Sequence, residues 1–250
     1  MLTRFKSKLS KKTQLTEDVF LLKFDLVEPQ EINFLAGQYL IILIPQTNQS
    51  DQFVKRLYSI SSSPDIKNSF ELLIKFLPGG VGSTYLTSLN EGSEMFFDGP
   101  AGVFTLKENN NNKIFLATGT GIAPIRSMLQ SNSKFKILNS KIYLFWGLQY
   151  YKDVYLFNEL KNYELTSLAS YKFQICLSRE ENLDIIPEND KKYFLLGHIN
   201  NGLQRIIENC KLKIENFDYY ICGNREVVED MKKFLLEKQI DKSKIYFEKF

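Results

Sequence analysis

The feature that most constrains the fold is a change of sequence pattern near the middle of the chain. After a run of four asparagines at 109–112, short apolar runs alternate with amphipathic segments as far as the last residue. In the clearest amphipathic segment, 226–240, Val227, Met231 and Phe234 recur at helical spacing. Strands that alternate with helices form βαβ units around a parallel sheet. The asparagine run is predicted to be a solvated loop that marks a domain boundary.

The residues before the asparagines follow a different pattern. Apolar and charged residues alternate over 4–9, and the apolar runs at 38–45 and 70–77 are short and flanked by turn residues. Several short strands separated by turns are typical of a barrel or sandwich. We predict two domains: an N-terminal antiparallel β-barrel, residues 1–107, and a C-terminal α/β parallel-sheet nucleotide-binding domain, residues 108–250.

Composition and charge exclude several classes of function. A net charge of +3 over 250 residues lacks the basic excess of a nucleic-acid-binding protein. Cys176, Cys210, Cys222 and the single His198 do not form an iron–sulfur run or a multi-histidine metal site. The N-terminus lacks the apolar segment of a secretory signal, and no run approaches the ~18 apolar residues of a membrane span. We expect no metal, no nucleic acid, no membrane insertion, and a cytoplasmic location.

The segment ATGTGIAP, 117–124, joins a predicted strand to a predicted helix. Gly119 and Gly121 allow the backbone to approach a ligand without a side-chain clash, and Pro124 suits the first turn of a helix. The free N–H groups and the dipole at a helix start favour a pyrophosphate. A tight strand–helix turn without a ligand is the alternative.

Two segments of the first domain contain residue types that suit a flavin. In RLYSIS, Arg56 offers a cation for phosphates, Tyr58 an aromatic face and Ser59 a hydrogen-bond partner. In PGGVGSTYL, 78–86, the glycines before Ser83 leave backbone N–H groups available for an anion. A serine-rich strand end and an ordinary loop with a helix N-cap are the respective alternatives.

The order of several short motifs resembles the ferredoxin–NADP reductase superfamily of flavoproteins, and its plant-type group in particular. The motifs are RLYSIS, GGVGST, GPAG, ATGTGIAP with a following arginine, WG, CGN and the terminal EKF, and they extend over essentially the whole chain. The resemblance implies an FAD-dependent oxidoreductase that transfers hydride between NADP(H) and the flavin and single electrons to or from a ferredoxin or flavodoxin. A NAD(P)H-dependent flavin reductase, the reductase component of an oxygenase, and a flavin-bearing regulatory or electron-transfer subunit with little activity alone are the alternatives.

The resemblance also implies a set of cofactor-binding residues. The flavin would be held by Arg56, Leu57, Tyr58 and Ser59, and its pyrophosphate by Gly82, Ser83 and Thr84. The nicotinamide nucleotide would be bound by Thr118, Gly119, Thr120 and Gly121, with Cys222 and Gly223 beside the nicotinamide.

Four residues are candidates for a catalytic role by the same resemblance: Ser59, Cys222, Glu248 and Phe250. Ser59 and Glu248 would adjust polarity and proton supply near flavin N5. Phe250 would cover the second flavin face and move aside for the nicotinamide. For Cys222, a buried small apolar side chain at a strand end is the alternative.

The choice between NADP(H) and NAD(H) depends on cations and hydroxyls for the 2′-phosphate. Ser178 and Arg179 follow a predicted strand, and Lys191 and Tyr193 stand in a K-x-Y spacing that resembles the phosphate pocket of the plant-type reductases. Against this, acidic residues lie between Arg179 and Lys191, and Gln149 replaces an arginine of some bacterial relatives. These residues favour NADP(H), with NAD(H) as the alternative.

A basic N-terminal strand could attract an acidic partner protein by long-range electrostatics. Its cations are Arg4, Lys6, Lys8, Lys11 and Lys12. A solvated strand face is the favoured explanation of the same pattern.

Overall fold

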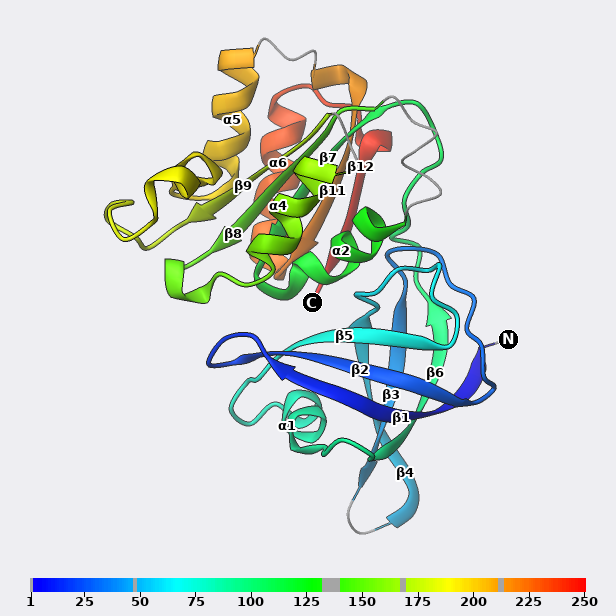
Figure 1. The fold of residues 1–250 in the computed structure, drawn as a ribbon. Helices are drawn as coiled ribbons and strands as arrows, with labels where there is room; N and C mark the ends of the chain where they lie inside the picture. The colour runs from blue at the N-terminus through cyan, green and yellow to red at the C-terminus, as the bar shows by residue number, and fades with distance from the viewer. Residues whose placement is uncertain (1, 47–48, 132–139, 167–169, 211–213) are drawn as a thin grey trace. The chain divides into compact units, whose positions relative to one another are not determined.

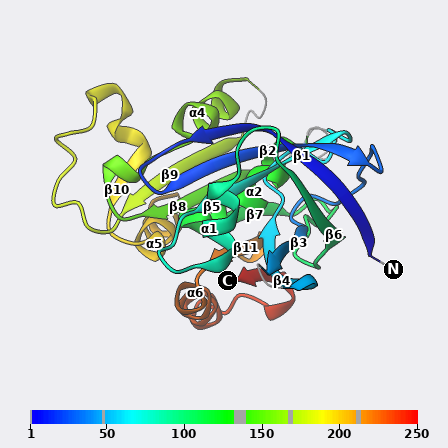
Figure 2. The same cartoon turned by 90° about the horizontal axis from the view of Figure 1, so that it is seen from below.

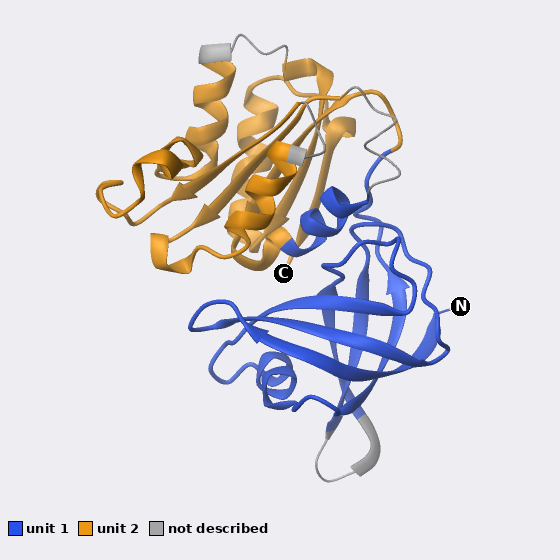
Figure 3. Cartoon of the chain, viewed as in Figure 1, with its two compact units in different colours: residues 1–107, 123–132 blue, residues 108–122, 133–250 orange. Residues whose placement is uncertain are grey.

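The chain folds into two compact units. The computed structural model describes residues 2–46, 49–131, 140–166, 170–210 and 214–250. One unit consists of residues 1–107 and 123–132, and the other of residues 108–122 and 133–250 (Figure 3). Among the helices in these described ranges, none combines the length and the apolar character needed to cross a bilayer.

The first unit is a six-stranded antiparallel sheet in the order β4-β3-β6-β1-β2-β5 (Figure 1). Beyond β4 the chain reaches β5: Ile60 forms a bridge with Leu72, and the N–H of Ser61 donates to the carbonyl oxygen of Glu71 at 2.8 Å. These pairings link the two ends of the sheet, so the predicted antiparallel β-barrel is confirmed. Its elements are β1 (Thr3–Gln14), β2 (Val19–Glu28), β3 (Tyr39–Gln46), β4 (Gln49–Ser59), β5 (Ser69–Lys75), α1 (Val81–Ser88) and β6 (Glu94–Ala101), together with α2 (Ile122–Gln130).

Aromatic side chains from several strands fill the interior of the barrel. The Phe5 ring stacks on Phe97 with centroids 5.1 Å apart, and Phe97 meets Phe70 edge to face at 4.7 Å. Burying a phenylalanine side chain contributes roughly 1.5–3 kcal/mol. Phe5 and Leu9 on β1 are buried while Arg4 and Lys8 are exposed, as the alternating pattern predicts.

The basic N-terminal strand is partly neutralised by its neighbour in the sheet. Arg4 pairs with Asp98 and Lys6 with Glu94, both at 2.8 Å, and both carboxylates belong to β6. These two cations are therefore compensated within the barrel, which supports the solvated strand face over an attracting surface.

The second unit is a six-stranded parallel sheet in the order β10-β9-β8-β7-β11-β12. Helices α5 and α6 pack on one face and α4 on the other (Figures 1 and 2). The predicted α/β parallel-sheet domain is confirmed. Its elements are β7 (Asn112–Thr118), η1 (Gly119–Gly121), β8 (Ile142–Leu148), η2 (Tyr151–Asp153), α4 (Phe157–Thr166), β9 (Tyr171–Leu177), η3 (Glu188–Tyr193), β10 (Phe194–Leu196), α5 (Ile199–Cys210), η4 (Ile214–Asn216), β11 (Phe217–Gly223), α6 (Arg225–Glu237), η5 (Lys242–Lys244) and β12 (Ile245–Lys249).

The asparagine run is more than a solvated loop, contrary to the expectation from its composition. Lys113 and Asp218 form an ion pair at 2.9 Å, and their side chains are 0% and 1% exposed. The side-chain amides of Asn109 and Asn111 each donate to an Asp218 oxygen at 2.9 Å. A buried charge requires such partners, so two of the asparagines complete a polar network between the start of β7 and the start of β11.

Helix α4 begins later than the helical spacing of apolar residues over 154–163 suggests. The carboxylate of Asp153 accepts a hydrogen bond from the N–H of Tyr150 at 3.0 Å, which closes the short turn η2. Leu156 then adopts a left-handed backbone with φ 57°, and α4 starts at Phe157. Local turn chemistry therefore overrides the helical pattern at this point.

Candidate functional site

The end of β4 lies against the first turn of α1, which brings two of the predicted flavin-binding segments together. A β-carbon on Gly82 would lie 2.5 Å from the phenol oxygen of Tyr58 and 3.0 Å from Cγ of Arg56. Such distances are too short for carbon and oxygen atoms, so any side chain at this position would displace the Tyr58 phenol and the Arg56 stem. RLYS and GGVGST, separate in the sequence, therefore form one cradle in the first unit.

The residues of β4 present different surfaces to this cradle. Tyr58 is half-buried against the barrel core, and burial raises the pKa of its phenol while the charge of Arg56 lowers it. Arg56 is exposed, and its guanidinium donates to the carbonyl oxygen of Lys55 at 2.9 Å. Leu57 is 58% exposed, and Ser59 ends the strand opposite Tyr39. A neutral phenol beside an exposed cation suits a cofactor that combines an aromatic ring with phosphates.

The N-terminus of α1 supplies the anion-binding part of the cradle. The first N–H groups of a helix have no partner within it, and here they belong to Val81, Gly82 and Ser83. The Ser83 hydroxyl accepts from the N–H of Leu77 at 3.0 Å and lies 3.2 Å from the carbonyl oxygens of Leu77 and Gly80. The Ser83 side chain therefore stabilises the loop between Leu77 and Gly80, while its backbone N–H is available to a ligand. Thr84 is exposed on the same turn.

The arginine that follows ATGTGIAP anchors α2 within the first unit. Arg126 is buried, and its guanidinium donates to the carbonyl oxygen of Ser61 at 3.0 Å and to the carboxylate of Glu71 at 2.6 Å. Ser61 follows the last residue of β4 by two positions in the sequence. Arg126 therefore fixes the chain just beyond the cradle.

The second cluster forms where β7 and β11 end in the second unit. Thr118 ends β7, and Gly119, Thr120 and Gly121 form the turn η1. A β-carbon on Gly121 would overlap the Cys222 carbonyl group, and one on Gly223 would overlap the Thr118 hydroxyl oxygen. The predicted TGTG and CGN segments are therefore packed backbone to backbone.

Two aromatic side chains hold the η1 turn, and the sequence assigned neither to the site. The indole N–H of Trp146 and the hydroxyl of Tyr155 donate to the carbonyl oxygen of Gly119 at 2.9 and 3.0 Å. Their rings meet edge to face with centroids 4.7 Å apart. Gly119 has a left-handed φ of 52° and open space around its α-carbon. Trp146 belongs to the WG motif, which is the only sequence signal for this support.

Cys222 is a buried thiol rather than a nucleophile. Its side chain is 1% exposed, and burial together with the charge of Glu248 raises its pKa well above the ordinary value. The thiolate is the reactive form of cysteine, and it is suppressed here. Cys222 therefore contributes a small neutral surface at the end of β11.

The last residues of the chain lie beside the CGN turn. Glu248 pairs with Cys222 across β11 and β12. The N–H of Phe250 donates to the carbonyl oxygen of Gly223 at 3.3 Å, while its side chain is 67% exposed. The roles of Glu248 near flavin N5 and of Phe250 against a flavin face stay predictions.

The four residues predicted to recognise a 2′-phosphate are not equally available. Tyr193 is 4% exposed and stacks on Phe173 at 4.8 Å, and burial raises its pKa to about 12. Lys191 pairs with Glu188 at 2.7 Å. The Ser178 hydroxyl donates to the carbonyl oxygen of Leu148 at 3.2 Å, and Arg179 is exposed. Arg179 is therefore the cation of this set best placed to meet a phosphate.

Comparison with known families identifies two domains. Residues 6–106 match the family described as Oxidoreductase FAD-binding domain, and residues 115–233 match the family described as Oxidoreductase NAD-binding domain. These ranges contain the β4–α1 cradle and the η1 turn, respectively.

Curated relatives match most of the chain. Ferredoxin–NADP reductase B of Sorangium cellulosum is 31% identical over 176 residues, which are 70% of this chain and 70% of that protein. The reductase component of propane 2-monooxygenase from Gordonia sp. (strain TY-5) is 28% identical over 94% of this chain and 64% of its own length. The toluate 1,2-dioxygenase electron transfer component of Pseudomonas putida is 28% identical over 98% of this chain and 67% of its own length. The chain thus spans about two thirds of these relatives.

Solved structures share the fold at lower identity. A cytochrome P450 reductase of Amycolatopsis superposes with a TM-score of 0.84 at 20% identity, over 100% of this chain and 70% of that one. A ferredoxin NADP⁺ reductase of Neisseria gonorrhoeae, solved with bound FAD and NADP, superposes with a TM-score of 0.81 at 20% identity, over 98% of both chains. At this identity the likeness shows the fold alone.

Proposed function

Because the chain belongs to the ferredoxin–NADP reductase superfamily of FAD- and NAD(P)-binding oxidoreductases, we propose that it moves electrons between NADP(H) and a ferredoxin or flavodoxin. The contact of Gly82 with Tyr58 and Arg56 is the observation that carries this proposal. FAD, when bound, accepts hydride from a nicotinamide and releases electrons singly. The chain's own residues bind and orient the two cofactors, and positioning supplies most of such catalysis.

Each residue of the cradle has a part in holding FAD. Tyr58 offers a neutral aromatic face, and Arg56 and the N–H groups of Gly82 and Ser83 neutralise phosphates. In the second unit, the backbone of the η1 turn binds the dinucleotide, and Cys222 leaves an uncharged surface for the nicotinamide.

Replacing Gly82 with valine is expected to weaken FAD binding by about fivefold to a hundredfold, because overpacking of this kind costs about 1–3 kcal/mol. The added side chain would occupy the space of the Tyr58 hydroxyl and the Arg56 stem. Flavin released from the purified protein, together with titration of the apoprotein by fluorescence, measures the effect.

Gly79→Asn is the matched control for this change. Gly79 lies in the same loop with φ 76°, a conformation that asparagine tolerates, and its α-carbon faces open space. We expect normal FAD content in this variant. Normal FAD content in Gly82→Val would remove the support for the cradle.

The preference for NADPH over NADH is expected to be small and to depend on Arg179. A hydrogen bond to a charged group is worth about 1.5–3 kcal/mol, so Arg179→Ala should lower kcat/KM for NADPH at least about tenfold and leave NADH unchanged. Lys172→Ala, an exposed cation on β9, the strand that precedes Arg179, is the control. A wild-type protein that prefers NADH, combined with no effect of Arg179→Ala, would refute the NADP assignment.

The reductase component of an oxygenase is the second candidate function, because relatives of that kind match 94% and 98% of this chain. The three cysteines of the sequence are too few to ligate an iron–sulfur cluster through four cysteines. Electrons must therefore leave the flavin for a carrier outside these residues.

Turnover assays with different acceptors distinguish the candidate functions. We expect NADPH-dependent reduction of cytochrome c to rise strongly when a ferredoxin or flavodoxin is added. An equal rate with free flavin and no response to either carrier would support a flavin reductase. Bound FAD with negligible turnover of any acceptor would support a regulatory subunit.

A further inference from the structure

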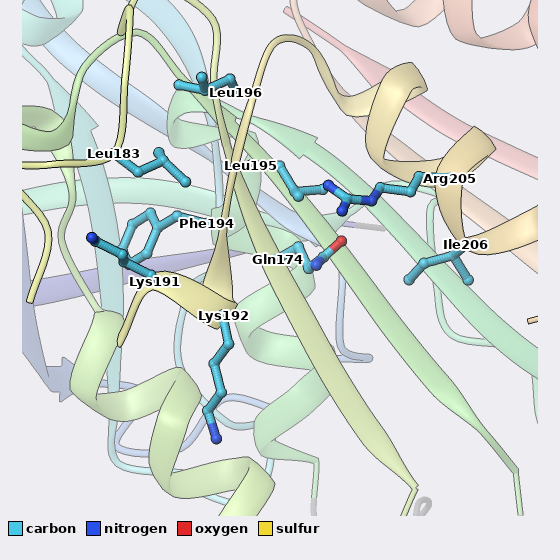
Figure 4. A pocket seen from close by; sticks show the side chains of 9 residues that line it. All are labelled: Gln174, Leu183, Lys191, Lys192, Phe194, Leu195, Leu196, Arg205 and Ile206. Carbon is cyan, nitrogen blue, oxygen red and sulfur yellow. The ribbon is translucent and has the colours of Figure 1, made fainter. Parts of the chain in front are cut away.

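The free edge of the parallel sheet borders a cavity that lies apart from the η1 turn. Strand β10 is the last strand of the sheet, and within the described part of the chain it pairs with β9 alone. A cavity of about 540 Å³ surrounds this edge between β10, η3 and α5 (Figure 4). Its lining belongs entirely to the second unit.

The backbone of β10 offers hydrogen-bonding groups on its free side. The N–H of Gly197 donates to the carbonyl oxygen of Leu177 on β9 at 2.8 Å. Because successive N–H groups of an extended chain point to opposite sides, the N–H of Leu196 points away from β9. The Leu196 side chain is 43% exposed. The edge is therefore open to a further strand.

Side chains of the cavity lie on both faces of the sheet. Phe194 and Leu196 lie on the face of α4, whereas Leu195 lies with Gln174 and Arg205 on the face of α5 (Figure 4). A single ligand that contacts the side chains on both faces must lie along the free edge of β10. An added extended segment does this, because its own side chains alternate between the two faces.

The charge of the lining selects the chemistry of the occupant. Lys191, Lys192 and Arg205 are among the described residues that line the cavity, and none of these lining residues is acidic, although Lys191 pairs with Glu188 at 2.7 Å. The side-chain amide oxygen of Gln174 is buried, lacks a hydrogen-bond partner among the described residues, and is available to accept from an N–H group. A second copy of this chain would bring the same cations into contact, which is unfavourable. An acidic segment would instead be attracted.

We propose that the free edge of β10 binds an extended acidic peptide segment of a partner protein by strand addition. The segment pairs with the backbone at Leu196, and its carboxylates meet Arg205 and Lys192.

A labelled peptide tests the proposal on the full chain. The probe is an acetylated, fluorescein-labelled hexapeptide of alternating glutamate and valine, and its fluorescence anisotropy reports binding at low salt. Leu196→Pro removes the outward N–H at an edge position where proline is tolerated. Arg205→Glu reverses one charge without altering the backbone. We expect each variant to bind about tenfold more weakly, as loss of a hydrogen bond or a charge pair predicts.

The controls separate strand addition from general attraction. Lys233→Glu, an exposed site on α6, should leave binding unchanged, and a lysine–valine hexapeptide should not bind. Failure of the glutamate–valine peptide to bind, or equal binding to the wild type and both variants, would overturn the proposal. Dimerisation that Leu196→Pro abolishes would also overturn it, because the edge would then serve a second copy.

Discussion

Replacing Lys113 with methionine is expected to lower the free energy of unfolding by about 3–5 kcal/mol, because it leaves the carboxylate of Asp218 buried without its cation. The Lys113 and Asp218 side chains are 0% and 1% exposed, so water cannot replace the lost partner. Thermal or urea denaturation of the purified protein measures the loss.

Two further variants identify the cause of that loss. Lys6→Met removes an exposed ion pair with Glu94 and should cost less than about 1 kcal/mol. The double variant Lys113→Met with Asp218→Leu should recover much of the stability, because no buried charge then remains. A Lys113→Met protein as stable as Lys6→Met would contradict the prediction.

The same network predicts a loss of stability in acid. Burial alone raises the pKa of Asp218, but hydrogen bonds from Lys113, Asn111 and Asn109 outweigh burial and lower it below the ordinary value. A lowered folded-state pKa gives stability that is fully present above the unfolded-state pKa and is lost as the pH falls through the folded-state pKa. The double variant should lose less stability on acidification than the wild type.

Replacing Gly121 with alanine is expected to lower kcat/KM for the nicotinamide nucleotide about a hundredfold, since a displacement of about 1 Å at a reacting centre can have that effect. The new β-carbon would lie 2.7 Å from the carbonyl carbon of Cys222, and backbone atoms cannot turn aside as a flexible side chain can. The η1 turn and the end of β11 must therefore separate. Steady-state kinetics with NADPH and NADH measures the effect.

Gly119→Ala is the matched control two residues away. The space around Gly119 is open, so the cost is the left-handed backbone, about 1–2 kcal/mol for an L-residue. We expect normal FAD content in both variants, because the FAD-binding residues belong to the first unit. Wild-type kcat/KM in Gly121→Ala would show that the packing of η1 on β11 does not support nucleotide binding.

Local sequence patterns predicted the antiparallel barrel and the α/β parallel-sheet domain, because strand and helix periodicity depend on residues that are close together in the sequence. In β1, Phe5 and Leu9 alternate with exposed cations as predicted. In α6, Met231 is buried in the core, and Val227 and Phe234 pack against it while partly buried. Strands β6 and β10 were not predicted, because β6 contains Gly99 and Pro100 and β10 has only three residues. Such segments form strands because they pair with neighbouring strands that are distant in the sequence, and a local pattern does not reveal this pairing.

The order of the domains and the glycine-rich turns could be predicted from the residues alone, because they follow from backbone conformation and motif order. The tertiary structure alone decided which distant residues meet: Gly82 with Tyr58, and Gly121 with Cys222. It also decided that Tyr193, predicted to recognise a phosphate, is buried against Phe173. The reason is that burial and close packing depend on strand register and on side chains far away in the sequence, which residue spacing does not encode.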